Sequence, residues 1–327
     1  MSNFSWGILG TGGIAQAFVD DLQLAEGHSI GAVGSRSLTK AQEFAKLLPG
    51  AVAYGSYEEL VHDKNIDAIY VATPHPMHEE HTLLALNAGK PVLCEKPFAI
   101  SAKQAQVMID TARKNKVALL EAMWTRYLPH IATVREILAA GTLGQIQTVE
   151  ADHGQRLADQ NIPRLIDPAL GGGALLDLGI YPVSFLHLVL GTPTHITARA
   201  VMTDSGVDAQ TSAIFDYADG AQGVINTTMI AQTPCRAVIS GLLGRLEIDT
   251  TFYNPTTMRV VLFDGTVTEY PNTYIGHGLR EEALEMARVV RAGELESPLM
   301  PWEQTLAVMK SMDHMRKQIG LTYPFEN

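Results

Sequence analysis

Three residues of this chain could move a proton on or off an alcohol oxygen: Lys96, Asp177 and Tyr181. Lys96 stands in the sequence Glu95-Lys96-Pro97, at the end of an apolar run that predicts a buried strand. Open α/β sheets bind their ligands at the carboxyl ends of their strands. Burial or a neighbouring charge can move the pKa of a lysine so placed toward neutrality, so that it can exchange protons. The alternative is a strand-end lysine that points into water.

Asp177 and Tyr181 lie in the glycine-rich segment 171–182. Their four-residue spacing predicts that both project from one face of a helix. A carboxylate beside a phenol, with an ammonium group from the first part of the chain, can transfer a proton to or from an alcohol. The alternative is a structural hydrogen bond in a helix–sheet interface. The three glycines at 171–173 let the helix start approach a ligand or another chain segment closely.

A second glycine-rich sequence, at 10–15, predicts a dinucleotide-binding turn because it follows a strand and opens a helix. Gly10 permits a tight turn, Gly12 lets the backbone approach a pyrophosphate, and Ala15 allows close helix–strand packing. The helix N-terminus offers N–H groups to phosphates. The cofactor-binding residues expected here are Gly10, Thr11, Gly12, Gly13 and Ile14.

The end of the second predicted strand favours NADP(H) over NAD(H), although NAD(H) stays possible. An NAD site usually places a carboxylate there for the ribose 2′-hydroxyl. This chain has Ser35 and Arg36 instead. Ser35 can donate a hydrogen bond to a 2′-phosphate, and Arg36 can pair with it and stack on adenine. The alternative for Arg36 is a solvated side chain in a surface turn.

The elements that must position these residues fall into two predicted domains, 1–122 and 123–327. The first alternates strands with helices and predicts a doubly wound parallel sheet of the Rossmann type. The second predicts an α+β domain whose mostly antiparallel sheet has one open face. Its expected helices are 127–140, 174–190, 279–291 and 302–319, and its expected strands are 195–202, 212–217, 224–230, 236–240, 245–249 and 258–263. A ligand cleft between the domains is the default expectation.

Composition narrows the classes of partner. The 327 residues carry a formal net charge of −11, which argues against nucleic acid or an anionic membrane surface as partner. The two cysteines, Cys94 and Cys235, form no disulfide framework and suit a reducing cytosol. With no leader or long apolar run evident, we expect a cytoplasmic protein that neither is secreted nor spans a membrane.

The glycine-rich start, the Glu95-Lys96-Pro97 motif and the antiparallel second domain together resemble the Gfo/Idh/MocA oxidoreductase family over nearly the full length. The segments 121–126, 171–182, 191–193 and 293–320 most resemble the branch of dimeric dihydrodiol dehydrogenases and NADP-dependent D-xylose dehydrogenases. Tyr181 stands where many members carry a catalytic His, and His75 where many have Asn. Both departures are as in this branch.

The resemblance implies roles for individual residues. Lys96 matches a lysine that touches the nicotinamide ribose and the reacting oxygen, and Asp177 matches a carboxylate that orients the substrate. Trp124 and Arg126 match residues at the nicotinamide end and the sugar or diol pocket. The alternative for Trp124 is a packing aromatic between domains. The complete catalytic set implied is Lys96, Tyr181 and Asp177. The remaining cofactor contacts expected are Thr73, His75, His78 and Glu95.

Two other features of the sequence could suggest a metal site or a nucleophile, but each has a simpler explanation. His75, His78 and His81 recur at three-residue spacing beside two glutamates, but a zinc site needs three or four converging ligands. We expect His75 and His78 at the cofactor edge, His81 in solvent, and no metal. Cys94 lies in a strand, which favours a core thiol over a nucleophile.

The sequence therefore predicts an NADP-dependent dehydrogenase of a sugar or vicinal diol, with a homodimer formed through the open sheet face. A cofactor-retaining glycoside hydrolase is an enzymatic alternative and would release an aglycone without net change in the cofactor. A dinucleotide-sensing regulator is a non-enzymatic alternative, which would not need Lys96, Asp177 and Tyr181. The particular substrate is left open, because it depends on the loop 154–168 and on several strands.

Overall fold

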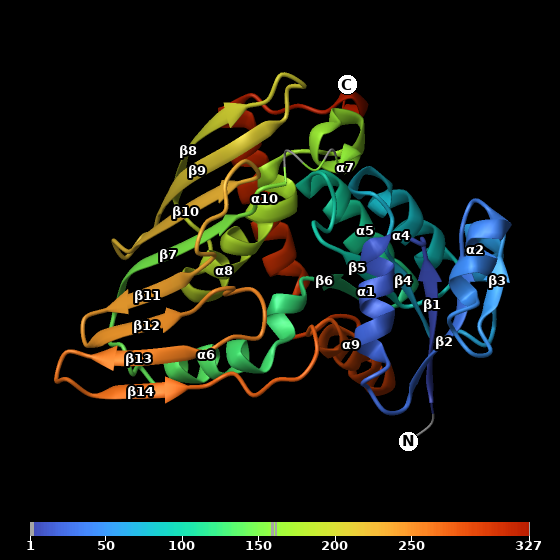
Figure 1. Cartoon of the computed structure of the whole chain (residues 1–327), viewed down its shortest axis with the longest axis horizontal. Coiled ribbons are helices and arrows are strands. Elements are labelled where there is room, and N and C mark those ends of the chain that lie inside the picture. The colour runs from blue at the N-terminus through green and yellow to red at the C-terminus, as the bar shows by residue number, and fades with distance from the viewer. Residues whose placement is uncertain (1–2, 158–159, 161, 327) are drawn as a thin grey trace. The chain divides into compact units, whose positions relative to one another are not determined.

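The computed structural model describes residues 3–157, 160 and 162–326, which form two compact units (Figure 1). Unit 1 comprises Met1–Tyr127 and Gly276–Thr305, and unit 2 comprises Leu128–Ile275 and Leu306–Asn327. The predicted domains were contiguous, whereas the segment 276–305 packs with unit 1. The buried carboxylate of Asp21 explains part of this return, since it accepts hydrogen bonds from the backbone N–H groups of His277, Gly278 and Arg280 at 2.7, 2.9 and 2.9 Å.

Unit 1 contains a six-stranded parallel sheet of order β3-β2-β1-β4-β5-β6, which confirms the predicted Rossmann-type fold. Its strands are β1 Phe4–Leu9, β2 His28–Gly34, β3 Val52–Tyr54, β4 Ala68–Val71, β5 Val92–Glu95 and β6 Leu119–Ala122. Its helices are α1 Gly13–Leu22, α2 Leu38–Ala45, α3 Tyr57–Val61, α4 His78–Asn87, α5 Ala102–Asn115 and α9 Arg280–Ala292, with 3₁₀ turns η1 His75–Met77 and η2 Trp124–Tyr127.

Serine side chains cap the first turns of two of these helices. The side chain of Ser37 accepts a hydrogen bond from the Lys40 backbone N–H at 3.5 Å, and that of Ser56 accepts one from Glu59 at 3.1 Å. Strands β4 and β5 are buried along their whole length. Their apolar runs are those of a parallel sheet covered on both faces, so the strand ends are the places left for polar chemistry.

Unit 2 contains an eight-stranded sheet of order β14-β13-β12-β11-β7-β10-β9-β8, in which β7 and β10 are parallel and the other pairs antiparallel. Two strands, β7 and β14, were absent from the sequence expectation. Central β7 was hidden because its inward positions include Ala151 and His153 while Glu150 and Asp152 alternate with them, so no apolar run marks it. The strands are β7 Ile146–Gly154, β8 His195–Met202, β9 Asp208–Asp216, β10 Gln222–Thr228, β11 Ala237–Gly241, β12 Gly244–Ile248, β13 Met258–Leu262 and β14 Val267–Tyr270.

The helices of unit 2 include α6 Pro129–Ala139, α7 Pro163–Ile166 and α8 Ile180–Leu190, together with most of α10 Trp302–Ile319. By length and composition alone, the segment Pro168–Leu190 could cross a membrane. However, 83% of its apolar 18-residue stretch is buried inside the protein. Packing of α8 against the sheet accounts for that composition. On the other sheet face, Ile214 and Val224 are directly opposite one another and 45% and 40% exposed.

The expected helix 174–190 is not uniform. Its first part is a π-turn, Leu175–Gly179, and the α-helix begins only at Ile180. Asp177 therefore lies in the π-turn and Tyr181 in the first turn of α8. Asp177 and Tyr181 are thus four residues apart across a junction between two helix types, and π-turns of this kind are frequent at functional sites.

Candidate functional site

The glycine-rich turn between β1 and α1 leaves room for a ligand against the backbone. Gly10 has φ +109°, and a Cβ there would meet the Ala72 carbonyl oxygen at 2.8 Å. A Cβ at Gly12 or Gly13 would meet nothing within 4 Å, and neither residue is buried. The first glycine is thus required by the protein itself, whereas the other two face open space at the start of α1, where backbone N–H groups favour phosphate.

A cavity of about 570 Å³ joins this turn to the ends of β2 and β4. Its cationic side chains are Arg36 and Lys40, both exposed. The Ser35 hydroxyl is fixed by the Ser37 backbone N–H at 3.3 Å. No carboxylate lines this cavity among the described residues. Its lining comprises Gly10, Thr11, Gly12, Ser35, Arg36, Ser37, Lys40, Tyr57, Ala72, Thr73 and Pro74.

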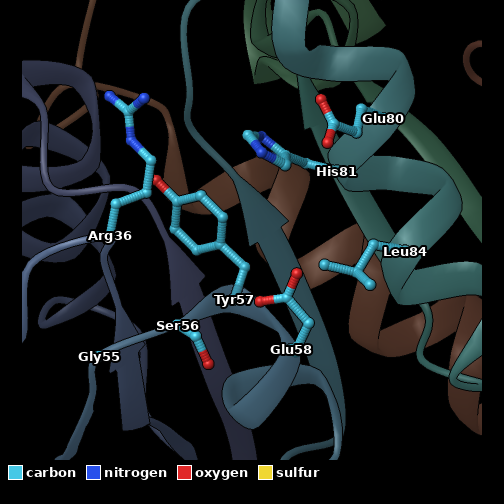
Figure 2. A pocket seen from close by; sticks show the side chains of 8 residues that line it. All are labelled: Arg36, Gly55, Ser56, Tyr57, Glu58, Glu80, His81 and Leu84. Atoms are coloured by element: carbon cyan, nitrogen blue, oxygen red, sulfur yellow. The ribbon is translucent and has the colours of Figure 1, made fainter.

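A second cavity, of about 520 Å³, shares Arg36 and Tyr57 with the first (Figure 2). Figure 2 shows Tyr57 between Arg36 and the α4 side chains His81, Glu80 and Leu84. The His81 ring packs edge-on to Tyr57 with centroids 4.6 Å apart. Burial raises the pKa of Tyr57, and the adjacent Arg36 charge opposes that rise. His81 was expected in solvent, but it is 8% exposed and lies 3.0 Å from the Thr73 hydroxyl.

The Glu95-Lys96-Pro97 segment ends β5 in a turn that hydrogen bonds to the Glu95 side chain hold in place. One oxygen of the buried Glu95 carboxylate accepts a hydrogen bond from the Tyr70 hydroxyl, and the other accepts one from the Lys96 backbone N–H at 3.0 Å. Lys96 itself is only partly buried. Glu95 thus fixes the backbone of the turn, and Lys96 follows the carboxyl end of β5, the strand between β4 and β6.

His78 ties this turn to the loop after β4. Its ring nitrogens lie 2.9 Å from the Pro97 carbonyl and 2.8 Å from that of Thr73. Burial lowers the pKa of His78 to about 4, so the ring is neutral and donates to one carbonyl at a time. It is fully buried, which gives it a structural role and does not favour the direct cofactor contact expected for it. Its neighbour His75 is partly exposed, with ring centroids 5.7 Å apart.

Trp124 and Arg126 lie in η2 and are 3% and 1% exposed. The Trp124 ring is 4.8 Å from that of His277, and Arg126 donates a hydrogen bond to Gln304 at 2.7 Å. Arg126 also lies beside Glu121, whose pKa is raised to about 7 by burial while the arginine charge opposes the rise. Within unit 1 both side chains hold the returning segment 276–305, and their predicted ligand contacts stay predictions.

Asp177 is held in the π-turn of unit 2. Its carboxylate pairs with Arg164 at 2.9 Å, and Asp177 is 8% and Arg164 50% exposed at the side chain. The start of the π-turn is fixed by Asp208, which accepts a hydrogen bond from the Leu175 backbone N–H at 2.8 Å. The preceding glycines press against protein: a Cβ at Gly172 would meet the Leu165 carbonyl oxygen at 2.8 Å. The sequence suggested that these glycines let the chain approach either a ligand or another chain segment. At Gly172, it is the segment at Leu165 that needs the room.

Tyr181 packs in an aromatic cluster that the sequence did not reveal. Its ring lies 5.2 Å from His153 and 4.8 Å from Tyr253, and these two rings stack at 4.1 Å. Gln155 bonds to both, at 2.9 Å to the His153 ring and 3.0 Å to the Tyr253 hydroxyl. Lys96 thus follows the end of a strand in unit 1. In unit 2, Asp177 lies in the π-turn and Tyr181 in the first turn of the helix after it.

The sequence reasoning missed several groups at these sites: Lys40, Tyr57, His153, Gln155, Arg164 and Tyr253. Lys40 could have been found, since it lies in the first turn of the helix that Ser37 caps. Tyr57 and Arg164 lie in the short helices α3 and α7, and the other three lie in the unrecognised β7 or in loops. No motif in the sequence connects these five residues to the site. Among the described residues, no group of three His, Cys, Asp or Glu side chains is arranged to hold a metal ion.

A Rossmann-type sheet with a glycine turn open to phosphate, followed by an α+β unit carrying an acidic and a phenolic group, defines a dinucleotide-dependent oxidoreductase architecture. Comparison with known proteins agrees. Residues 4–123 match the model of the oxidoreductase family with an NAD-binding Rossmann fold, and residues 131–247 match the GFO/IDH/MocA C-terminal domain. The chain belongs to the Gfo/Idh/MocA oxidoreductase family, as the sequence motifs suggested.

Curated relatives cover nearly the whole chain. The D-xylose 1-dehydrogenase (NADP⁺) of Hypocrea jecorina is 38% identical, over 98% of this chain and 93% of the relative. The trans-1,2-dihydrobenzene-1,2-diol dehydrogenase of Xenopus tropicalis is 37% identical, over 98% and 99%. Among solved structures, the 3-ketoreductase KijD10 of Actinomadura kijaniata, in complex with NADP and TDP-benzene, is 25% identical with a TM-score of 0.86, over 97% and 98%.

Proposed function

We propose that this protein is an NADP-dependent oxidoreductase that transfers hydride between nicotinamide and a carbinol or hemiacetal carbon of a sugar or vicinal diol. The observation that carries the proposal is the cavity at the ends of β1, β2 and β4. It combines the open glycine turn with the cations Arg36 and Lys40 and has no lining carboxylate among the described residues. Relatives named as NADP⁺-linked xylose and dihydrodiol dehydrogenases support the same reaction class.

The residues fit such a cofactor. Gly12 and Gly13 leave the backbone accessible for a pyrophosphate, and Ser35, Arg36 and Lys40 offer donors to a 2′-phosphate. The bound nicotinamide would supply the hydride acceptor or donor. NAD(H) would bind at the same glycine turn, but it has no 2′-phosphate to pair with Arg36 and Lys40.

The proposed roles of the reacting side chains follow from their chemistry. Lys96 and Tyr181 donate hydrogen bonds to the substrate oxygen on which charge develops, and they share its proton. Asp177 accepts hydrogen bonds from substrate hydroxyls and is held for this by Arg164. Local geometry supports these roles: Glu95 fixes the backbone at Lys96, and the π-turn carries Asp177 four residues before Tyr181.

We further propose that residues 1–122 bind the cofactor and that 123–327 supply substrate binding and a homodimer interface. The open face of the second sheet supports this interface, because Ile214 and Val224 form an exposed apolar pair on the neighbouring strands β9 and β10. A cytoplasmic location and the absence of nucleic-acid or membrane partners stay predictions from composition. No described feature favours the glycoside hydrolase or the sensor.

A screen of sugars, polyols and vicinal diols with NADP⁺ and NAD⁺ in parallel, read by nicotinamide absorbance, tests the proposal. We expect NADP⁺-linked oxidation of at least one sugar or diol. Release of an aglycone without net reduction would indicate the hydrolase instead. Tight NADPH binding without turnover of any compound would indicate the sensor.

A further inference from the structure

The groups beside Tyr181 form a polar chain whose hydrogen bonds can be assigned. His153 is 1% exposed, and its Nδ1 lies 3.1 Å from the Leu178 carbonyl oxygen. A carbonyl only accepts, so Nδ1 carries the proton and Nε2 must accept. The acceptor Nε2 lies 2.9 Å from Nε2 of Gln155. One N–H of the Gln155 amide is therefore used by His153.

The second N–H of Gln155 is used by Tyr253. The same amide nitrogen donates to the Tyr253 hydroxyl oxygen at 3.0 Å. With both N–H groups engaged, the orientation of the amide is set and its Oε1 is the atom left to bind something else. In the part of the chain that the structure describes, no group donates to this oxygen, and the residue is only half-buried. Gln155 thus presents a fixed acceptor.

This acceptor belongs to the surroundings of Tyr181. Gln155 bonds to His153 and Tyr253, and both of their rings contact that of Tyr181, with centroids 5.2 and 4.8 Å apart. The π-turn that ends just before Tyr181 carries Asp177, paired with Arg164. A substrate whose reacting hydroxyl lies at Tyr181 would have the Gln155 amide, the Tyr253 phenol and the Asp177–Arg164 ion pair around it.

We infer that Gln155 is a specificity-determining residue and that the substrate is a polyhydroxylated sugar rather than a dihydrodiol with an apolar ring. The inference rests on the proposed function and deepens it. A sugar presents further hydroxyls beyond the reacting pair, and one of them can donate to Gln155 Oε1. A dihydrodiol spends its two hydroxyls at the reacting centre and turns C–H groups toward the amide. The oxygen would then lose water without gaining a partner, which costs binding.

The test compares kcat/KM for D-xylose and for trans-1,2-dihydrobenzene-1,2-diol, both with NADP⁺, in the native protein and in Gln155→Met. We expect the native protein to prefer the sugar. Methionine keeps the length of the side chain but removes its donors and acceptor, so we expect kcat/KM for the sugar to fall about threefold to tenfold, as for one neutral hydrogen bond. The value for the diol should stay within about twofold, so the ratio of the two substrates moves.

Gln106→Met is the matched control, because Gln106 is an exposed glutamine of α5 in unit 1 that bonds Asp110. It should leave both substrates unchanged. Tyr253→Phe, which keeps the stacked ring but removes the oxygen that orients Gln155, should shift the ratio in the same direction. NADP binding and the unfolding temperature show that each variant is folded.

The outcomes separate the two proposals. If no sugar or diol is oxidised with either cofactor, the proposed function fails and this inference fails with it. If turnover occurs but the dihydrodiol is preferred by the native protein, only the inference is overturned. It is also overturned if Gln155→Met lowers kcat/KM for both substrates by the same factor, since a merely structural role would act on both alike.

Discussion

The cation pair at the end of β2 leads to a quantitative prediction about cofactor choice. Arg36 and Lys40 line the cavity that joins the glycine turn to Ser35. A hydrogen bond to a charged group contributes about 1.5–3 kcal/mol. Both side chains are exposed, so solvent screening places each at the lower end, about 1.5 kcal/mol or roughly tenfold in Kd. Arg36→Ala and Lys40→Ala should each weaken NADP⁺ binding about tenfold, and the double variant about a hundredfold.

The assay is titration of the native protein and the three variants with NADP⁺ and with NAD⁺ by calorimetry. NAD⁺ lacks the 2′-phosphate, so its Kd should change less than about twofold in every variant. Repeating the NADP⁺ titration at higher salt should shrink the differences, because exposed charges are screened within about a Debye length. Lys46→Ala is the control, since Lys46 is an exposed lysine at the opposite end of α2.

Two results would refute this reasoning. The native protein could bind NAD⁺ as tightly as NADP⁺, in which case the cations do not select the cofactor. Alternatively, Arg36→Ala could weaken both cofactors equally, which would place the arginine against the adenine they share rather than the 2′-phosphate.

Three further predictions follow from the sites. Tyr181→Phe keeps the ring contacts with His153 and Tyr253 and should lower kcat about a hundredfold to ten-thousandfold with NADP⁺ affinity unchanged; a kcat near that of the native enzyme across pH would remove Tyr181 from the proton transfer. Burial raises the pKa of Asp208 from 3.8 to about 7, so the folded state keeps a proton that the unfolded chain loses and stability falls as pH rises between these values. The difference corresponds to about 4 kcal/mol, and urea unfolding of Asp208→Asn from pH 4 to 8 should show a flatter profile than the native protein; parallel profiles would contradict the assignment. Light scattering at micromolar concentration should give the mass of a dimer, and Ile214→Lys with Val224→Lys should give a monomer; a native monomer would exclude the proposed interface.

The sequence predicted most elements of both units because their signals are local. Apolar runs and helical periodicity place β8 at 195–202 and α10 at 302–319 as observed. The same locality explains the failures. β7 has few large apolar residues and draws its stability from neighbours on both sides, β10 and β11. The return of 276–305 to unit 1 depends on the Asp21 carboxylate, more than 250 residues distant in the chain.

The candidate site divides in the same way. The proposed cofactor residues lie in or next to recognisable motifs, so the sequence predicted Gly10, Gly12, Ser35 and Arg36 and could have predicted Lys40. The surroundings of Tyr181 come from β7, from the loop after it and from Tyr253. No spacing rule connects those positions, because their proximity results from strand register in unit 2.

The π-turn shows how long-range contacts set the geometry of motif residues. Its two ends are held by groups from other strands: Asp208 of β9 accepts from the Leu175 N–H, and His153 of β7 donates to the Leu178 carbonyl. A π-turn leaves backbone groups outside the regular helical ladder, and these two side chains satisfy groups at its ends. Asp177 lies between the two anchors, paired with Arg164. The motif supplies the carboxylate, and side chains of β7 and β9 hold the turn that carries it. Residues outside the motif therefore set the position of the carboxylate that is proposed to bind substrate.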